Sequence, residues 1–156
     1  MSLYIKAYLA SLVSLLTLAG LFNFAVDPYG IHNTITISGI NHPKSQMQNH
    51  EKFFKAYMSG KLRPESVSMG TSRTDFGIDP SVSSWGEPLP RYNMALAGGD
   101  VYVTRRFLEH NSAIQPLRKF VYGLDFFTFN AMRPQAADYD GDILAIDDNG
   151  EANSYF

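Results

Sequence analysis

The hydrophobic pattern divides the chain into one long apolar run and a remainder of shorter amphipathic segments. Residues 7–26 contain no charged residue. An α-helix rises about 1.5 Å per residue, so a run of this length spans a hydrocarbon core of about 30 Å. Lys6 and the amino terminus supply positive charge before the run, and Asp27 is the first charge after it. This asymmetry predicts a single-pass helix with its N-terminus in the cytoplasm and the following chain outside.

A cleaved signal peptide has the same polarity as an anchor. Thr17-Leu18-Ala19 offers small residues for cleavage, but the apolar run continues beyond Ala19 to Val26, which a signal peptide does not require. We therefore favour a retained anchor over residues 1–26, while both interpretations export the rest of the chain.

Beyond the run the pattern predicts a linker over 27–44 and an α/β domain with an acidic tail over 45–156. Its expected elements are a helix at 45–59, a strand at 66–69, a helix at 100–111 and a second buried strand at 120–124. Strand, helix and strand at this spacing imply a parallel α/β unit.

Side-chain positions follow from these two expected helices. The first places its apolar residues near one face, including Phe54, Tyr57 and Met58. The second begins at Asp100 as its N-cap. Its apolar residues Val103, Phe107 and Leu108 are expected to face inward, and Arg105 and Arg106 outward.

Composition excludes several classes of function. The net charge of -2 supplies no basic field for nucleic acid. The absence of cysteine excludes disulfides, thiolate metal sites and a cysteine nucleophile. Acidic stretches at 138–142 and 147–151 have the oxygen ligands that calcium prefers, but their spacing does not match an EF-hand. We favour a solvated acidic loop, and we predict no metal and no cofactor.

The Gly-Thr-Ser-Arg turn at 70–73 is the segment that carries candidate chemistry. It follows the first strand directly, which places Ser72 at the carboxyl edge of the sheet, where ligand sites lie in open α/β folds. A helix after the turn would aim amide donors at a developing oxyanion. Arg73 suits a phosphate, carboxylate or sulfate, or else an ion pair with Asp75 or Asp79. A plain turn serine is the alternative for Ser72.

Five short stretches stand together in a recognisable order. They are Val-Asp-Pro-Tyr-Gly at 26–30, Met-Gly-Thr-Ser-Arg-Thr at 69–74, Gly-Ile-Asp-Pro at 77–80, Tyr-Asn-Met-Ala-Leu-Ala-Gly at 92–98 and Gly-Leu-Asp-Phe-Phe-Thr-Phe-Asn at 123–130. The set resembles bacterial membrane-anchored proteins with an SGNH/GDSL-hydrolase-like extracytoplasmic domain, over roughly residues 20–130. The resemblance implies a partial SGNH-like parallel α/β domain on the periplasmic side of the inner or cytoplasmic membrane.

The resemblance also implies roles for individual residues. Ser72 matches the nucleophile, and Gly98 matches the glycine whose amide helps to form the oxyanion hole, with Gly99 an equally good match. Asp125 stands where the family usually has Asn. An ionised carboxylate cannot donate a hydrogen bond to an oxyanion. Asp125 therefore carries a proton, or another group donates, or the site does not perform acyl transfer.

The general base of the family comes from a later Asp-x-x-His block that does not occur before Phe156. The histidines of the chain do not follow that pattern: His32, His42, His50 and His110. A serine hydroxyl is a poor nucleophile without a base. We therefore expect an accessory or structural subunit that docks on a membrane or envelope complex. Its expected partners are the lipid bilayer and a protein, or further chain, that covers the half-domain.

Two other functions stay open. The chain is alternatively the N-terminal part of a serine esterase or O-acyltransferase that acts on an envelope or secreted polysaccharide, with Ser72 as nucleophile. A third reading, in which Arg73 binds an anionic ligand without catalysis, is not separated from the accessory role by the sequence.

Overall fold

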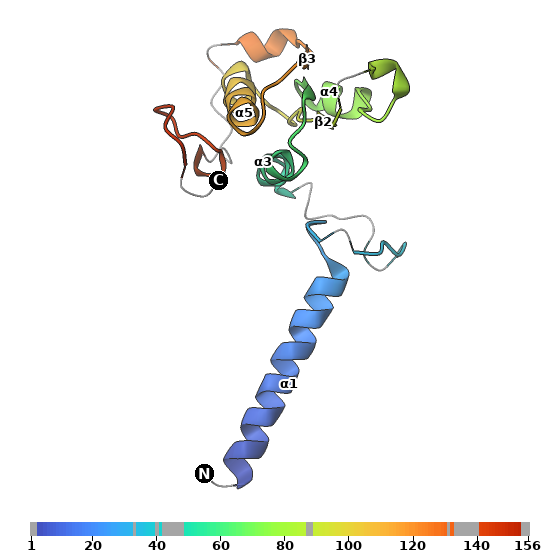
Figure 1. Ribbon diagram of the computed structural model, residues 1–156, viewed down its shortest axis with the longest axis vertical. Helices are drawn as coiled ribbons and strands as arrows, with labels where there is room; N and C mark the ends of the chain where they lie inside the picture. The colour runs from blue at the N-terminus through green and yellow to red at the C-terminus, as the bar shows by residue number, and fades with distance from the viewer. Residues whose placement is uncertain are drawn as a thin grey trace. The chain divides into compact units, whose positions relative to one another are not determined.

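The computed structural model describes residues 3–32, 34–39, 41, 49–86, 89–130, 132 and 141–153 (Figure 1). The chain forms two compact units, Met1–His50 and Glu51–Phe156.

The first unit is dominated by helix α1 (Leu3–Val26), which has no buried residue. Its most apolar window has a mean hydropathy of 2.0, so α1 is long and apolar enough to cross a membrane. A signal sequence at the N-terminus satisfies the same criterion. The hydroxyls of Ser11, Ser14 and Thr17 donate to backbone carbonyls one turn earlier, at 2.8–3.0 Å. These polar side chains are thereby satisfied inside an apolar helix.

The chain folds back on the end of α1 immediately after Val26. Asp27 adopts a left-handed backbone conformation with φ of 44°, and its buried carboxylate accepts the backbone N–H of Ile31 at 2.9 Å. The amide of Asn41 donates to the carbonyls of Ala25 at 3.2 Å and of Ile35 at 2.9 Å. Part of the predicted linker therefore caps the helix through side chains.

The second unit contains a three-stranded parallel sheet of order β2-β1-β3. Its strands are β1 (Ser66–Met69), β2 (Arg91–Asn93) and β3 (Lys119–Tyr122). The predicted parallel α/β arrangement is confirmed. Strand β2 was not predicted, because its three residues lack an apolar pattern.

Helices α3 (Glu51–Leu62) and α5 (Val101–Ile114) contact each other (Figure 1). Asp100 caps α5 as predicted, since its carboxylate accepts the N–H of Val103 at 2.7 Å. The short helix α4 (Ser72–Gly77) contacts β1. The 3-10 turn η1 (Ser83–Trp85) approaches β3, where the Lys119 ammonium donates to the Trp85 carbonyl.

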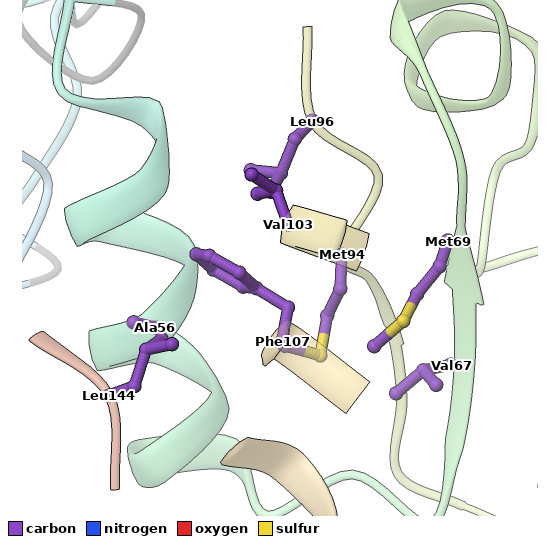
Figure 2. Packing of buried hydrophobic residues seen from close by; sticks show 8 residues of the cluster. All are labelled: Ala56, Val67, Met69, Met94, Leu96, Val103, Phe107 and Leu144. Atoms are coloured by element: carbon purple, nitrogen blue, oxygen red, sulfur yellow. The ribbon is translucent and has the colours of Figure 1, made fainter. Parts of the chain in front are cut away.

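A cluster of buried apolar residues joins these elements (Figure 2). Figure 2 shows Phe107 of α5 between Ala56 of α3 and Met69 of β1. Leu144, which follows the 3-10 turn η3 (Gly141–Ile143), is fully buried in the same cluster. The acidic tail is therefore not a wholly solvated loop, because Leu144 fixes this part of it to the core.

Two predicted side-chain orientations are wrong. Helix α3 buries Lys52, Lys55, Ala56 and Ser59, whereas Tyr57 is 36% exposed. Arg106 is buried rather than outward: its guanidinium donates to the Ile146 carbonyl at 2.8 Å and pairs with Glu109 at 2.8 Å and Asp148 at 3.3 Å. Charged side chains are buried in this unit where distant parts of the chain supply opposite charges or carbonyl groups.

His110 is fully buried on α5, with both ring nitrogens hydrogen-bonded. Nδ1 accepts the backbone N–H of Ala145 at 2.8 Å, so Nε2 carries the proton and donates to the Ala56 carbonyl at 3.1 Å. Burial lowers the pKa of His110, although the hydrogen bond to Ala56 opposes this shift. His110 thus links α3, α5 and the tail as a neutral imidazole.

This arrangement predicts that acid destabilises the second unit. The unfolded chain protonates His110 below about pH 6.5, whereas the folded chain does so only at lower pH. The free energy of unfolding should therefore fall as pH drops through about 6.5, by up to about 1.4 kcal/mol per pH unit from this group. His110→Gln should remove that part of the slope in chemical denaturation between pH 5.5 and 8. An identical slope in the variant contradicts the prediction.

Candidate functional site

Ser72 lies at the carboxyl edge of the central strand, where the sequence placed it. Gly70 directly follows β1 and has φ of 149°, and a Cβ there would lie 2.3 Å from Thr74 Oγ1 and 2.8 Å from the Gly123 carbonyl oxygen. Only glycine fits this turn. Thr71 then caps α4, so Ser72 is its first residue. The Ser72 side chain is half-buried and has no hydrogen-bond partner among the residues the structure describes.

Asp125 lies beside this turn, and its carboxylate holds two residues of it. The side chain is buried, and it accepts hydrogen bonds from the Thr71 hydroxyl and from Arg73 Nη1, the latter at 2.8 Å. The ion pair of Arg73 is therefore with Asp125, not with Asp75 or Asp79. The Asp125 carboxylate here acts as an acceptor that joins the end of β3 to the start of α4.

Arg73 keeps most of its surface in solvent despite this ion pair. Its side chain is 78% exposed, and its guanidinium carbon lies 6.0 Å from the centre of the Phe127 ring. A guanidinium has five N–H donors, so one bond to Asp125 leaves further donors at the surface. Arg73 is thus placed beside Ser72 with donors that an anionic group can reach.

The two glycines proposed for the oxyanion hole lie in a turn that reaches the same edge. The backbone N–H of Leu96 donates to the Gly70 carbonyl at 3.0 Å. Gly98 has φ of 68°, and a Cβ on Gly99 would lie 3.6 Å from the Gly70 carbonyl oxygen. The structure brings this turn to the Gly70 end of β1, and it does not separate Gly98 from Gly99 as the family match.

His110 is the one histidine in the sequence of the second unit, and it does not contact Ser72 because it is buried in the core. Both of its nitrogens hold backbone groups, as described above. His32 and His50 belong to the first unit, and His42 lies outside the described residues. Within the described residues of the second unit, no histidine is therefore placed to act as a base for Ser72.

Lys55 is the centre of a charge cluster between α3 and α4 that the sequence did not indicate. Its ammonium lies 3.0 Å from Glu51 and 2.5 Å from Asp75, and it also donates to the Ala95 carbonyl. These contacts tie α3 to α4 and to the residues after β2. The lysine carried no sequence signal, because its partners lie on two other segments.

Asn93 provides a second attachment for α4. Its amide nitrogen donates to the carbonyls of Thr74, Asp75 and Ile78 at 2.8–3.2 Å, and its oxygen accepts the N–H of Ala95 at 3.0 Å. The last carbonyls of a helix need such donors. Asn93 thereby fixes the C-terminal end of the helix whose first residue is Ser72.

No group of three or more metal-ligating side chains occurs within the described residues. Asp147 uses its carboxylate to accept the backbone N–H groups of Asn149 and Glu151, at 2.9 and 2.8 Å. Asp148 pairs with Arg106. These two acidic residues stabilise a turn, whereas the stretch at 138–140 lies outside the described residues.

Comparisons of the chain with protein families, with curated proteins and with solved structures find no match.

Gly123 gives a test of how tightly the site is packed. A Cβ on Gly123 would lie 1.9 Å from Thr74 Oγ1, so Gly123→Ala should force α4 away from β3. We expect a loss of about 1–3 kcal/mol in the free energy of unfolding. Chemical denaturation of the full chain in detergent measures it.

Gly77→Ala is the matched control, since a Cβ on Gly77 has nothing within 4 Å. It should change stability by no more than about 0.5 kcal/mol. Adding Thr74→Ala to Gly123→Ala removes the clashing oxygen, so the double variant should recover part of the loss. Equal effects of the two glycine substitutions would show that the contact is not tight.

Proposed function

We propose that this chain is a membrane-anchored accessory subunit of the bacterial envelope. In this proposal α1 stays in the membrane with its N-terminus in the cytoplasm. The second unit is an SGNH-like α/β domain on the outer side, and it docks on a protein of an envelope complex without hydrolysing esters. The length and composition of α1 support the anchor. The parallel sheet with Ser72 at the end of β1 supports the SGNH-like ancestry.

An exposed apolar surface after β3 carries the docking proposal. It comprises Leu124, Phe126, Phe129 and Met132, which we call the η2 surface after the 3-10 turn η2 (Phe126–Phe129). Phe126 is 96% exposed and Met132 is 90% exposed. Exposed apolar side chains scattered singly are ordinary, so four large ones within residues 124–132 mark this segment as the candidate docking site.

The site itself supports binding more than catalysis. The Asp125 carboxylate is used to hold Thr71 and Arg73, and His110 holds backbone groups in the core. A serine nucleophile needs a positioned base and oxyanion donors. The described residues of this unit supply the serine, but they do not bring a histidine to it.

The docking proposal is tested by photo-crosslinking in native membranes. A benzophenone amino acid in place of Phe126 should give a specific protein adduct, because this side chain faces solvent from the η2 surface. Leu124→Ser with Phe129→Ser should abolish the adduct by removing neighbouring apolar contacts.

Phe53, which is 47% exposed on α3, is the control position, because the same substitution there lies outside the η2 surface. Equal adducts at both positions, or an adduct that survives the double serine variant, would exclude docking through the η2 surface.

A serine esterase or acyltransferase acting on an envelope or secreted polysaccharide is the second candidate. It is favoured by one observation: the half-buried Ser72 hydroxyl lies at the start of α4 without a partner among the described residues. This function requires a base from elsewhere in the complete protein or from a partner.

Ester hydrolysis by the purified full chain separates the two candidates. We expect the wild type and Ser72→Ala to hydrolyse nitrophenyl acetate and acetylated polysaccharide at the same background rate, because no described residue of this unit brings a histidine base to the hydroxyl. Ser112→Ala, at an exposed position of α5, controls for nonspecific effects. A tenfold or larger loss in Ser72→Ala alone would establish the esterase and remove the non-catalytic proposal.

A further inference from the structure

The backbone turn after α1 forms a pocket against the last turns of that helix. The pocket has a volume of about 380 Å³, and the described residues that line it all belong to the first unit. Its lining combines apolar and polar side chains, and the inference depends on six of them: Gly20, Asn23, Phe24, Asp27, Tyr29 and His32. Pockets of about 300–1,000 Å³ are typical of sites for small molecules. This one is therefore large enough for a polar headgroup.

The polarity of the lining changes along the axis of α1. Gly20 lies six residues before Val26, which corresponds to about 9 Å at about 1.5 Å per residue. The pocket is apolar at Gly20 and Phe24, within the membrane-length part of the helix, and it is polar at Asp27 and His32. A phospholipid has the same order of groups, because its acyl chains lie in the hydrocarbon core and its headgroup lies outside that core.

Lipid is the occupant that the anchor itself brings to this pocket. Helix α1 has no buried residue, so a bilayer that contains α1 surrounds it with lipid on all sides. The Asn23 side chain is exposed and makes no hydrogen bond within the described residues. Hydrocarbon offers no acceptor to an amide, and the ester and phosphate oxygens of a lipid do. A lipid with its polar groups in the pocket therefore satisfies Asn23.

The charge of the segment favours an ammonium headgroup over an anionic one. Residues 7–43 contain neither lysine nor arginine, which are the side chains that bind anionic headgroups. The carboxylate of Asp27 lines the pocket, and it accepts the backbone N–H of His32 at 3.3 Å. The rings of Phe24 and His32 have centroids 5.0 Å apart, and Tyr29 is 38% exposed. An ammonium is attracted both by a carboxylate and by the faces of aromatic rings.

We propose that this pocket binds the headgroup of an aminophospholipid, a phosphodiester that carries a primary ammonium. The ammonium lies against the rings of Phe24 and Tyr29 near Asp27, and the Asn23 amide donates to a phosphate or ester oxygen. The inference rests on the proposed membrane anchor and deepens it, because it names the lipid that the outer end of α1 selects. It does not involve the η2 surface.

Filling the pocket tests whether a lipid occupies it. The full chain in mild detergent is given equal amounts of phosphatidylethanolamine and phosphatidylglycerol with the same acyl chains, and bound lipid is counted by native mass spectrometry. We expect one phosphatidylethanolamine per chain, with a preference of about tenfold over phosphatidylglycerol. Gly20→Leu should abolish this binding. A Cβ at Gly20 meets nothing within 4 Å, so the new side chain fills the pocket without a clash.

Ala19→Leu is the matched control, since Ala19 is exposed on α1 and does not line the pocket. This variant should keep the wild-type binding and the wild-type preference. Three results overturn the inference: no bound lipid on the wild type, equal retention of the two lipids, or the same binding in both leucine variants.

Asp27→Asn tests the assignment of the ammonium. Asparagine keeps the size of the side chain and an acceptor oxygen, and it tolerates the left-handed backbone at this position, where φ is 44°. The variant should still bind phosphatidylethanolamine, but its preference should fall from about tenfold to about twofold, because the carboxylate charge is lost. A preference that stays at the wild-type value overturns the inference.

Alkaline carbonate extraction of native membranes separates this inference from the proposed anchor. A chain that stays in the washed membrane but shows no lipid preference removes the headgroup site and keeps the anchor. A chain that carbonate releases, or one that has lost α1 by cleavage, removes the anchor and the headgroup site together.

Discussion

The close approach of Gly70, Thr74 and Gly123 is the constraint on which the candidate site depends. Thr74 reaches from α4 into space that side chains on either glycine would fill. This contact lets the first turn of α4 lie against the ends of both β1 and β3. The Thr71 hydroxyl and Arg73 can then meet the Asp125 carboxylate. Ser72 owes its position to these neighbours, since its own side chain contributes no hydrogen bond within the described residues.

The sequence predicted those elements whose signal is local. The apolar run of α1, strand β1, the turn before Ser72 and the Asp100 cap of α5 are each encoded within a few neighbouring residues. The single apolar helix and the parallel sheet were predictable for that reason. The SGNH-like identity and the role of Ser72 stay predictions, because no comparison or ligand bears on them.

The unpredicted features depend on residues far apart in the sequence. Arg106 is buried because Ile146 and Asp148, some 40 residues later, supply its acceptors. Lys55 is buried because Asp75 and Ala95 lie beside it. Hydrophobic periodicity assigns charged residues to the surface and cannot detect partners that lie far away in the sequence. The same holds for Asp125, whose acceptor role becomes visible only when the ends of β1 and β3 are brought together.

The side-chain cap on α1 has a consequence for how a helix of this kind can sit in a bilayer. The last carbonyls of an α-helix lack partners within the helix and normally obtain them from water or headgroups. Asn41 satisfies the Ala25 carbonyl from within the protein. For a helix inserted in lipid, this relieves one carbonyl of the final turn of the need to reach water or headgroups. A segment outside the apolar run thereby takes over part of the solvation that the end of such a helix needs.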